Sequence, residues 1–166
     1  MTAKKVPKVP EVVITYTHCV QGRLMERALH RLLAEAGHDV VSDRDMANPP
    51  SIQRWMVEMI TSRIILCVLT LDYIRAFGGE GGDNWARLGV QYEATLVRQR
   101  IYYNHSRFDI CPVIPVAAPG FDVNLCPLDL RALDVQRFDP NTGAGAERLL
   151  ARIQKITVGA EGTMML

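Results

Sequence analysis

A single glutamate interrupts an apolar helical pattern in the second half of the chain. The segment LGVQYEATLVRQRIYYN, residues 88–104, repeats apolar residues at the spacing of one helix face: Val90, Ala94, Val97 and Ile101. Glu93 lies on the shoulder of this stripe, so its carboxylate is half turned toward the interior. A carboxylate in this position is either a solvated charge, which the helix dipole favours near a helix start, or a group directed at a ligand.

Aromatic and acidic residues also follow three apolar segments that are typical of strands. Tyr16 and His18 follow the first segment, Asp43 and Asp45 the second, and Tyr73 the third. In a parallel α/β sheet, ligands bind outside the carboxyl ends of the strands, near the point where the strand order reverses. These residues therefore mark the location of a site, without yet assigning its chemistry.

The elements that must position these residues alternate between strands and helices. Strands are expected at 12–16, 40–41, 64–69, 110–117 and 133–138. Helices with periodic apolar faces are expected at 22–37, 51–62, 88–104 and 145–156. The alternation predicts βαβ units, and hence a parallel sheet of about five strands with helices on both faces in a single domain.

Two of the expected strands carry a more specific prediction. The segment 64–69 is apolar at every position, which is typical of a strand covered on both faces of a parallel sheet. The segment 110–117 contains Pro112 and Pro115, and it is predicted to be an edge or irregular strand because proline cannot donate to a sheet ladder.

Composition and charge exclude several classes of function. A formal charge of +1 on 166 residues argues against non-specific electrostatic binding to nucleic acid or to an anionic membrane. No secretory signal is visible, and the longest apolar run is too short to span a bilayer. The expected location is therefore the cytoplasm, where the four cysteines, none of them in a CxxC pair, stay reduced.

The familiar ligand motifs are missing or weak. There is no GxGxxG after the first strand and no GxxxxGK[ST], and the histidines show no paired spacing for a metal. The stretch GGEGG resembles a phosphate cradle only in composition. Asp43 and Asp45 lack the lysine that a phospho-receiver pocket needs. Trp55 lies on a helical stripe and is expected in the core, whereas Trp85, beside the glycine-rich stretch, suits a ligand platform.

Five short motifs follow one another between Val12 and Phe138. They are VVITYTH, DVVSDRD, SIQRWMVEMITSRIILCVLTLDY, GVQYEATLVRQRIY and CPVIPV. In this order they resemble the SEFIR domain of the TIR-like superfamily, of bacterial type. Tyr92 and Ala94 stand where SEFIR domains usually carry Trp and Gly. The resemblance covers most of the chain and implies a flavodoxin-like sheet, the same architecture that the hydrophobic pattern predicts.

The resemblance also implies a function. Some members of these families are adaptors that self-associate in signalling, and others cleave the nicotinamide–ribose bond of NAD⁺, often in bacterial defence against phage. We expect the second activity, with NAD⁺ as substrate and no cofactor or metal; a non-enzymatic adaptor module is the alternative. By resemblance, Glu93 is the catalytic carboxylate, and Tyr16, His18 and Asp43 line the substrate pocket. Further substrate-binding candidates are Asp45, Tyr73, Trp85 and Tyr92.

Assembly is part of the same expectation. The segment RDMANPP, residues 44–50, lies where the family has its self-association loop. The implied partners are further copies of the domain, in an oligomer or filament, and a fused or separate sensor domain. On this interpretation, residues 1–158 form the domain and residues 159–166 a tail or the start of a linker.

Overall fold

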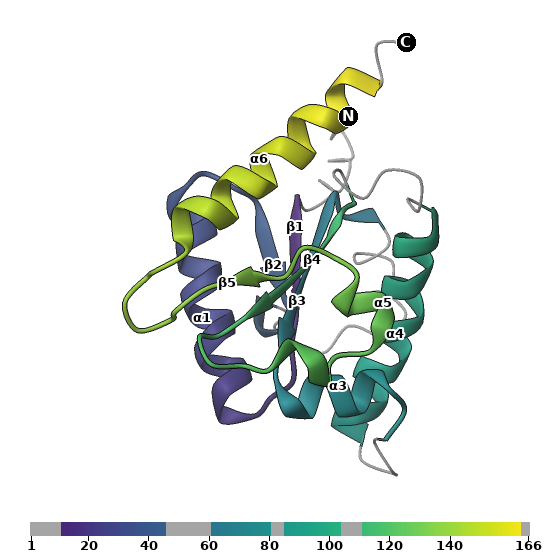
Figure 1. Cartoon of the computed structure of the whole chain (residues 1–166). Helices are drawn as coiled ribbons and strands as arrows, with labels where there is room; N and C mark the ends of the chain where they lie inside the picture. The colour runs from purple at the N-terminus through teal and green to yellow at the C-terminus, as the bar shows by residue number, and fades with distance from the viewer. Residues whose placement is uncertain (1–10, 46–60, 81–84, 104–110, 164–166) are drawn as a thin grey trace, which may run out of the picture.

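The computed structural model contains one parallel five-stranded sheet (Figure 1). It describes residues 11–45, 61–80, 85–103 and 111–163. The strands are β1 (Val12–Thr15), β2 (Val40–Ser42), β3 (Ile64–Leu69), β4 (Val113–Ala117) and β5 (Gln136–Arg137). Their order is β2-β1-β3-β4-β5, and every neighbouring pair is parallel. The predicted flavodoxin-like sheet is therefore confirmed, with its reversal of strand order beside β1.

Helices cover both faces of the sheet. One face packs against α1 (Val20–Glu35) and α6 (Ala146–Thr163), and the other against α3 (Leu71–Phe77), α4 (Trp85–Tyr103) and α5 (Leu128–Arg131). Two short 3-10 turns, η1 (Asp43–Asp45) and η3 (Val123–Leu125), follow β2 and β4. The apolar stripe that the sequence predicts on α4 is fully buried on its face of the sheet.

The alternation of side chains along β1 decides which groups can meet at the site. Val13 packs with α3 and α4, whereas Ile14 and Tyr16 pack with α1 and α6. Because successive strand residues point to opposite faces, Thr15 and Tyr16 diverge at the carboxyl end of β1. The end of this one strand therefore supplies functional groups to both sides of the sheet.

The prediction of an edge strand at 110–117 is wrong, because β4 lies between β3 and β5. The carbonyl of Ala117 faces β5, where it accepts the N–H of Phe138 at 2.9 Å. Pro115 lies two residues before Ala117, so its nitrogen also faces β5. The pairing between β4 and β5 begins only after Pro115, at Val116 and Gln136. The donor that proline lacks is therefore not needed, and an interior strand tolerates the residue.

Other elements differ from the prediction in length or existence. The sequence pattern did not predict α3, a helix of seven residues that begins directly after β3 with Thr70 as its N-cap. The last helix, α6, continues to Thr163, beyond the segment 145–156 from which it was expected. The expected helix at 51–62 lies mostly outside the described residues.

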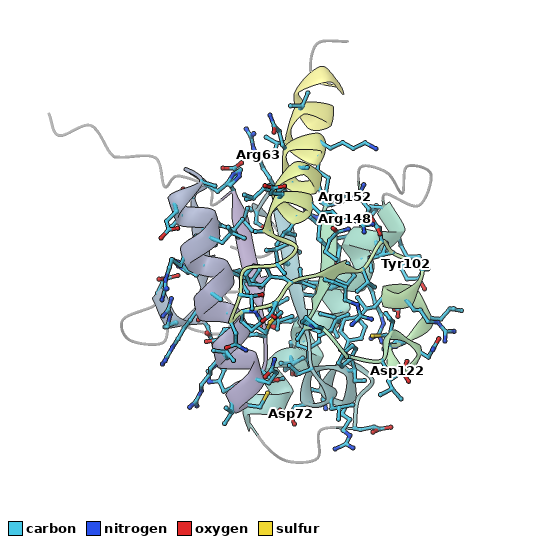
Figure 2. All side chains as sticks on the ribbon, turned by 60° about the vertical axis from the view of Figure 1, so that its left-hand side comes forward. Arg63, Asp72, Tyr102, Asp122, Arg148 and Arg152 are labelled. Atoms are coloured by element: carbon cyan, nitrogen blue, oxygen red, sulfur yellow. The ribbon has the colours of Figure 1, made fainter. Side chains whose placement is uncertain are left out.

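The polar surface surrounds this core. In Figure 2 the labelled charged side chains Arg63, Asp72 and Asp122 lie at the periphery of the fold. Asp72 follows β3 in the first turn of α3, so it marks the edge at which the strands end. Within the described part of the chain, every helix is too short or too polar to cross a bilayer.

Candidate functional site at the carboxyl edge of the sheet

Two groups of polar side chains lie on either side of the end of β1. The first, which we call the Glu93 cluster, consists of Thr15, Tyr73 and Glu93 on the α3–α4 side. The second, which we call the arginine pocket, lies on the α1 side and has a volume of about 270 Å³. The residues that line it are Tyr16, His18, Arg23, Glu26, Arg27, Asp43 and Arg44.

The carboxylate of Glu93 is held at the end of β1. Its Oε2 accepts a hydrogen bond from the hydroxyl of Thr15, which is buried at the last position of the strand. The hydroxyl oxygens of Thr15 and Tyr73 are also in hydrogen-bond contact, at 3.3 Å. Tyr73 is completely buried, and burial together with the nearby Cys67 and Glu93 raises its pKa well above its ordinary value. The neutral phenol therefore supports Thr15, and Thr15 orients Glu93.

The helix dipole does not account for this glutamate. The sequence pattern began the helix at residue 88, but α4 begins at Trp85, so Glu93 lies in its third turn. The dipole effect falls off within the first turn. Glu93 is half-buried and lies beside Ala94, which packs fully into the core. Its position is therefore explained by the hydrogen bond to β1 and not by the helix terminus.

A network of hydroxyl and thiol groups fixes the loop between β1 and α1. Thr17 Oγ1 lies 3.1 Å from Thr70 Oγ1, and Thr70 also accepts the backbone N–H of Tyr73 at 3.1 Å. Cys19 caps α1, because its sulfur accepts the backbone N–H of Gly22 at 3.3 Å. These contacts join the ends of β1 and β3, and they hold His18 over the edge of the sheet.

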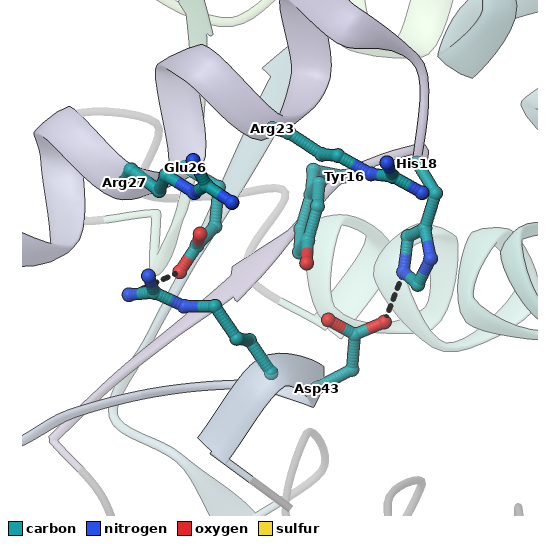
Figure 3. A pocket seen from close by; sticks show the side chains of 7 residues that line it. Tyr16, His18, Arg23, Glu26, Arg27 and Asp43 are labelled. Carbon is teal, nitrogen blue, oxygen red and sulfur yellow. Dashed lines mark hydrogen bonds and ion pairs between the residues drawn. The ribbon is translucent and has the colours of Figure 1, made fainter.

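His18 and Asp43 form an ion pair in the arginine pocket (Figure 3). Nε2 of His18 bonds Oδ2 of Asp43, and the rings of His18 and Tyr16 stack with their centroids 5.1 Å apart. The hydrogen bond to Asp43 raises the pKa of His18 above 6.5, against the opposing effect of burial. Burial alone would raise the pKa of Asp43, but His18 and the nearby hydroxyl of Tyr16 lower it overall.

Tyr16 connects the pair to the core. Burial raises its pKa first, and the negative charges of Asp43 and Glu26 raise it further, so the phenol stays neutral. In Figure 3 its hydroxyl points toward the carboxylate of Asp43. The negative charge of Glu93 also raises the pKa of His18, although more weakly than Asp43 does. The Glu93 cluster and the arginine pocket are thus coupled electrostatically across the end of β1.

The remaining predicted site residues lie outside the Glu93 cluster and the arginine pocket, or outside the described residues. Asp45 lies beside the pocket residues in sequence, but its Oδ2 bonds Nε2 of His30 at 2.9 Å and accepts the backbone N–H of Ser42 at 2.8 Å. It therefore shapes the turn after β2. Tyr92 is 56% exposed on α4 and does not line the arginine pocket. The side chain of Trp85 and most of the segment RDMANPP lie outside the described residues.

Four charged residues of the pocket were missed by the sequence analysis. Glu26 is 1% exposed, where it accepts from the hydroxyl of Ser42 at 2.8 Å and pairs with Arg44 at 3.3 Å. The sequence did contain a signal for Glu26. It adjoins Met25 on the buried apolar stripe of α1, just as Glu93 adjoins the apolar stripe of α4. Arg23 and Arg27 carried no such signal, since arginine on an exposed helix face is ordinary.

The described residues offer no set of ligands for a metal ion. No three histidine, cysteine, aspartate or glutamate side chains among them converge in a way that could hold one. All four cysteines are free thiols, and burial raises the pKa of the Cys67 thiol to about 12. The groups available for chemistry here are carboxylates, an imidazole, hydroxyls and guanidinium groups.

We expect the pKa of His18 to fall when Asp43 is replaced by asparagine. The hydrogen bond to the carboxylate is the main reason that the pKa lies above 6.5, and burial and Arg23 oppose protonation once it is gone. NMR titration of the ring protons measures this, with His30, which pairs with Asp45 instead, as the internal reference. An unchanged His18 titration would contradict the pairing.

The same pair predicts how stability depends on pH. The raised pKa of His18 stabilises the fold below pH 6.5, and this contribution is lost as the pH rises through the folded-state value. The lowered pKa of Asp43 stabilises it above pH 3.8, and this contribution is lost as the pH falls through the folded-state value. The difference in Tm between the wild type and Asp43→Asn should therefore be largest between these two pH values.

Comparison with known proteins supports the fold and not yet an activity. No protein-family model matches the sequence, and no curated protein matches it. Among solved structures, the chain is similar to a metazoan TIR-STING receptor from C. gigas in complex with 2',3'-cGAMP, with a TM-score of 0.62 and 15% identity over 90% of this chain and 40% of that one. A second structure of a metazoan TIR-STING receptor from C. gigas gives a TM-score of 0.57 and 16% identity over 92% of this chain and 41% of that one.

The likeness establishes a TIR-like fold for this chain. The chain spans about two fifths of the length of these receptors. At this level of identity, fold and function are separate questions, because one fold hosts unrelated chemistries. Function must therefore be argued from the Glu93 cluster and the arginine pocket.

Proposed function

We propose that this TIR-like domain cleaves the nicotinamide–ribose bond of NAD⁺, as the bacterial SEFIR resemblance implies, in a defence system that self-association activates. One observation carries the proposal: a half-buried glutamate is oriented by a buried hydroxyl at the carboxyl edge of a parallel sheet. Glu93 comes from α4 and Thr15 from β1, so tertiary structure brings together two residues that are 78 positions apart.

The chemistry suits a single carboxylate. Nicotinamide leaves as a neutral base from a cationic nitrogen, so its departure needs no general acid. Positive charge develops on the ribose, and a pre-oriented carboxylate stabilises such an oxocarbenium-like transition state electrostatically. Under the proposal Glu93 performs this role, and the hydrogen bond from Thr15 holds it in place so that little reorganisation is required during the reaction.

The arginine pocket supplies a complementary charge. His18 lines the pocket; its contact with Asp43 raises the pKa of its imidazole, and the negative charge of Glu93 raises it further. A dinucleotide with negative phosphates and a positive nicotinamide ring matches this distribution of charges, with the phosphates near His18 and the nicotinamide ribose near Glu93. Tyr16 and Asp43 support His18 in this arrangement.

The proposal is tested by following nicotinamide release from NAD⁺ over a range of protein concentrations. We expect specific activity to rise steeply with concentration or with an added crowding agent, because the proposed active state is an assembly. Light scattering on the same samples reports the oligomeric state. Full specific activity in a dilute sample that scatters as a monomer would refute activation by self-association, while leaving cleavage itself established.

An adaptor module remains the alternative. It predicts that assembled protein releases no nicotinamide, and that substitutions in RDMANPP abolish homotypic binding alone. Absence of product at millimolar NAD⁺ in a sample that light scattering shows to be assembled would decide for the adaptor.

A further inference from the structure

Charges in the arginine pocket do not balance within the described residues. The two carboxylates of the lining are each paired, Glu26 with Arg44 at 3.3 Å and Asp43 with His18. Arg23 and Arg27 line the same pocket, and neither forms an ion pair with a carboxylate in the described part of the chain. Among the described residues, the pocket therefore contains two guanidinium groups without a carboxylate partner.

The arrangement of these arginines is unfavourable without a ligand. Arg23 and Arg27 are four residues apart on α1, and like charges at this spacing destabilise a helix. Arg23 also lowers the pKa of His18, which lines the same pocket. An anion bound between these groups would relieve all of these repulsions.

The helix itself adds to the positive field. The first turn of α1, a helix of 16 residues, contains no acidic side chain, so nothing within the helix offsets the positive end of its dipole. This turn lies at the carboxyl end of β1, where helix N-termini of α/β folds bind phosphates. Arg23 and Arg27 are both exposed and reachable from solvent, and in Figure 3 both extend from the helix beside Tyr16 and Glu26.

We infer that the arginine pocket binds the phosphate groups of a small phosphorylated ligand, with Arg23 and Arg27 as the principal contacts. Guanidinium groups match phosphate geometry, and charge-assisted hydrogen bonds are the strongest class available to a pocket open to solvent. A volume of about 270 Å³ lies just below the usual range for whole ligands, so the pocket accommodates a diphosphate and part of its carrier.

The identity of the carrier rests on the proposed function. NAD⁺ contains a diphosphate, and its scissile ribose would then extend past His18 toward Glu93. The phosphate site itself does not depend on cleavage, because its residues lie on the α1 side of β1 whereas Glu93 lies on the other. Binding and cleavage can therefore fail independently.

The test measures binding of ADP, pyrophosphate and adenosine by calorimetry at low ionic strength. ADP keeps the diphosphate and lacks the nicotinamide–ribose bond, so it cannot be cleaved there. We expect a Kd of about 1 mM or tighter for ADP, weakening with added salt, and a loss of about tenfold or more in the double variant Arg23→Gln, Arg27→Gln. Pyrophosphate should bind through the same residues, and adenosine should bind much more weakly.

One variant serves as the matched control. Arg31→Gln removes the next arginine along the exposed side of α1, which does not line the pocket, and should bind ADP like the wild type. Circular dichroism melts confirm that each variant is folded.

Unchanged ADP affinity in the double variant would overturn the inference, as would adenosine binding as tightly as ADP. Absence of ADP binding to the wild type at 10-fold above the expected Kd would do the same. If ADP binds through the arginines while NAD⁺ is not cleaved, the phosphate site stands and the proposed hydrolase activity falls. If NAD⁺ is cleaved while the double variant binds ADP normally, the proposed hydrolase activity stands and the phosphate site falls.

Discussion

Replacement of Glu93 by glutamine is expected to reduce nicotinamide release from NAD⁺ by about 100- to 1000-fold or more, while the fold is retained. The substitution keeps the shape and the acceptor oxygen that Thr15 contacts, but it removes the negative charge. Deleting one pre-oriented electrostatic group costs a factor of this order in other enzymes. Nicotinamide is quantified chromatographically on assembled samples of both proteins at equal concentration.

A companion pair of variants separates charge from positioning. Thr15→Val removes the hydroxyl that orients Glu93 and keeps the side-chain volume, and it should lower the rate roughly 10- to 100-fold through misplacement of the carboxylate. Thr15→Ser keeps the hydroxyl and should restore most of the rate. Nicotinamide release at the wild-type rate in Glu93→Gln would show that Glu93 is not the catalytic residue, whatever the rates of the Thr15 variants.

Replacement of Gly22 by alanine is expected to destabilise the fold, although alanine is the better helix former. A methyl group at this position would lie 2.1 Å from the carbonyl oxygen of Thr17, in a backbone contact that cannot relax by side-chain motion. The gain in helix propensity is about 1 kcal/mol, whereas overpacking that shifts the backbone costs about 1–3 kcal/mol and occasionally more. The clash therefore outweighs the propensity, and the loop must move away from α1.

The consequence extends to the site, because Thr17 and Cys19 flank His18. We expect a drop of several degrees in Tm, roughly 2–4 °C for each kcal/mol in a domain of this size, together with displaced NMR signals for His18. Gly78→Ala is the matched control: its methyl group would lie 3.3 Å from the carbonyl oxygen of Ile74, a tight contact that needs a shift of only a few tenths of an ångström, at a negative φ of −78°. Equal Tm changes in the two variants would contradict the steric account.

Local pattern determined much of the architecture. The continuous apolar run of β3 indicated a strand covered on both faces, and the stripe on α4 indicated the face that packs on the sheet. Both predictions depend on the spacing of side chains within one element, which is set by the geometry of a strand or a helix. The same reasoning predicted a candidate site at the carboxyl ends of the strands, because ligands bind there in parallel α/β sheets in general.

The short helix α3 and the interior position of the proline-containing strand β4 could not be predicted in this way. Seven residues are too few to show a helical period, so α3 was not predicted, and its cap at Thr70 became meaningful only beside Thr17. Pro115 suggested an edge strand, yet the late start of β5 leaves no partner opposite its nitrogen. Whether a missing donor matters depends on where the neighbouring strand begins, which is a property of two segments and not of one.

The sequence by itself determined that Glu93 lies on the shoulder of an apolar helical stripe, and it determined the alternation of strands and helices that carries the residue. Only the tertiary structure decided what the carboxylate meets, because the hydroxyl of Thr15 comes from a strand 78 residues away. It also decided that Thr15 and Tyr16, adjacent in the chain, serve opposite faces of the sheet, and that Glu26, Arg23 and Arg27 enclose a pocket with Asp43. Periodicity reports which way a side chain points within its own element; the partner it finds there depends on strand order and packing between distant segments.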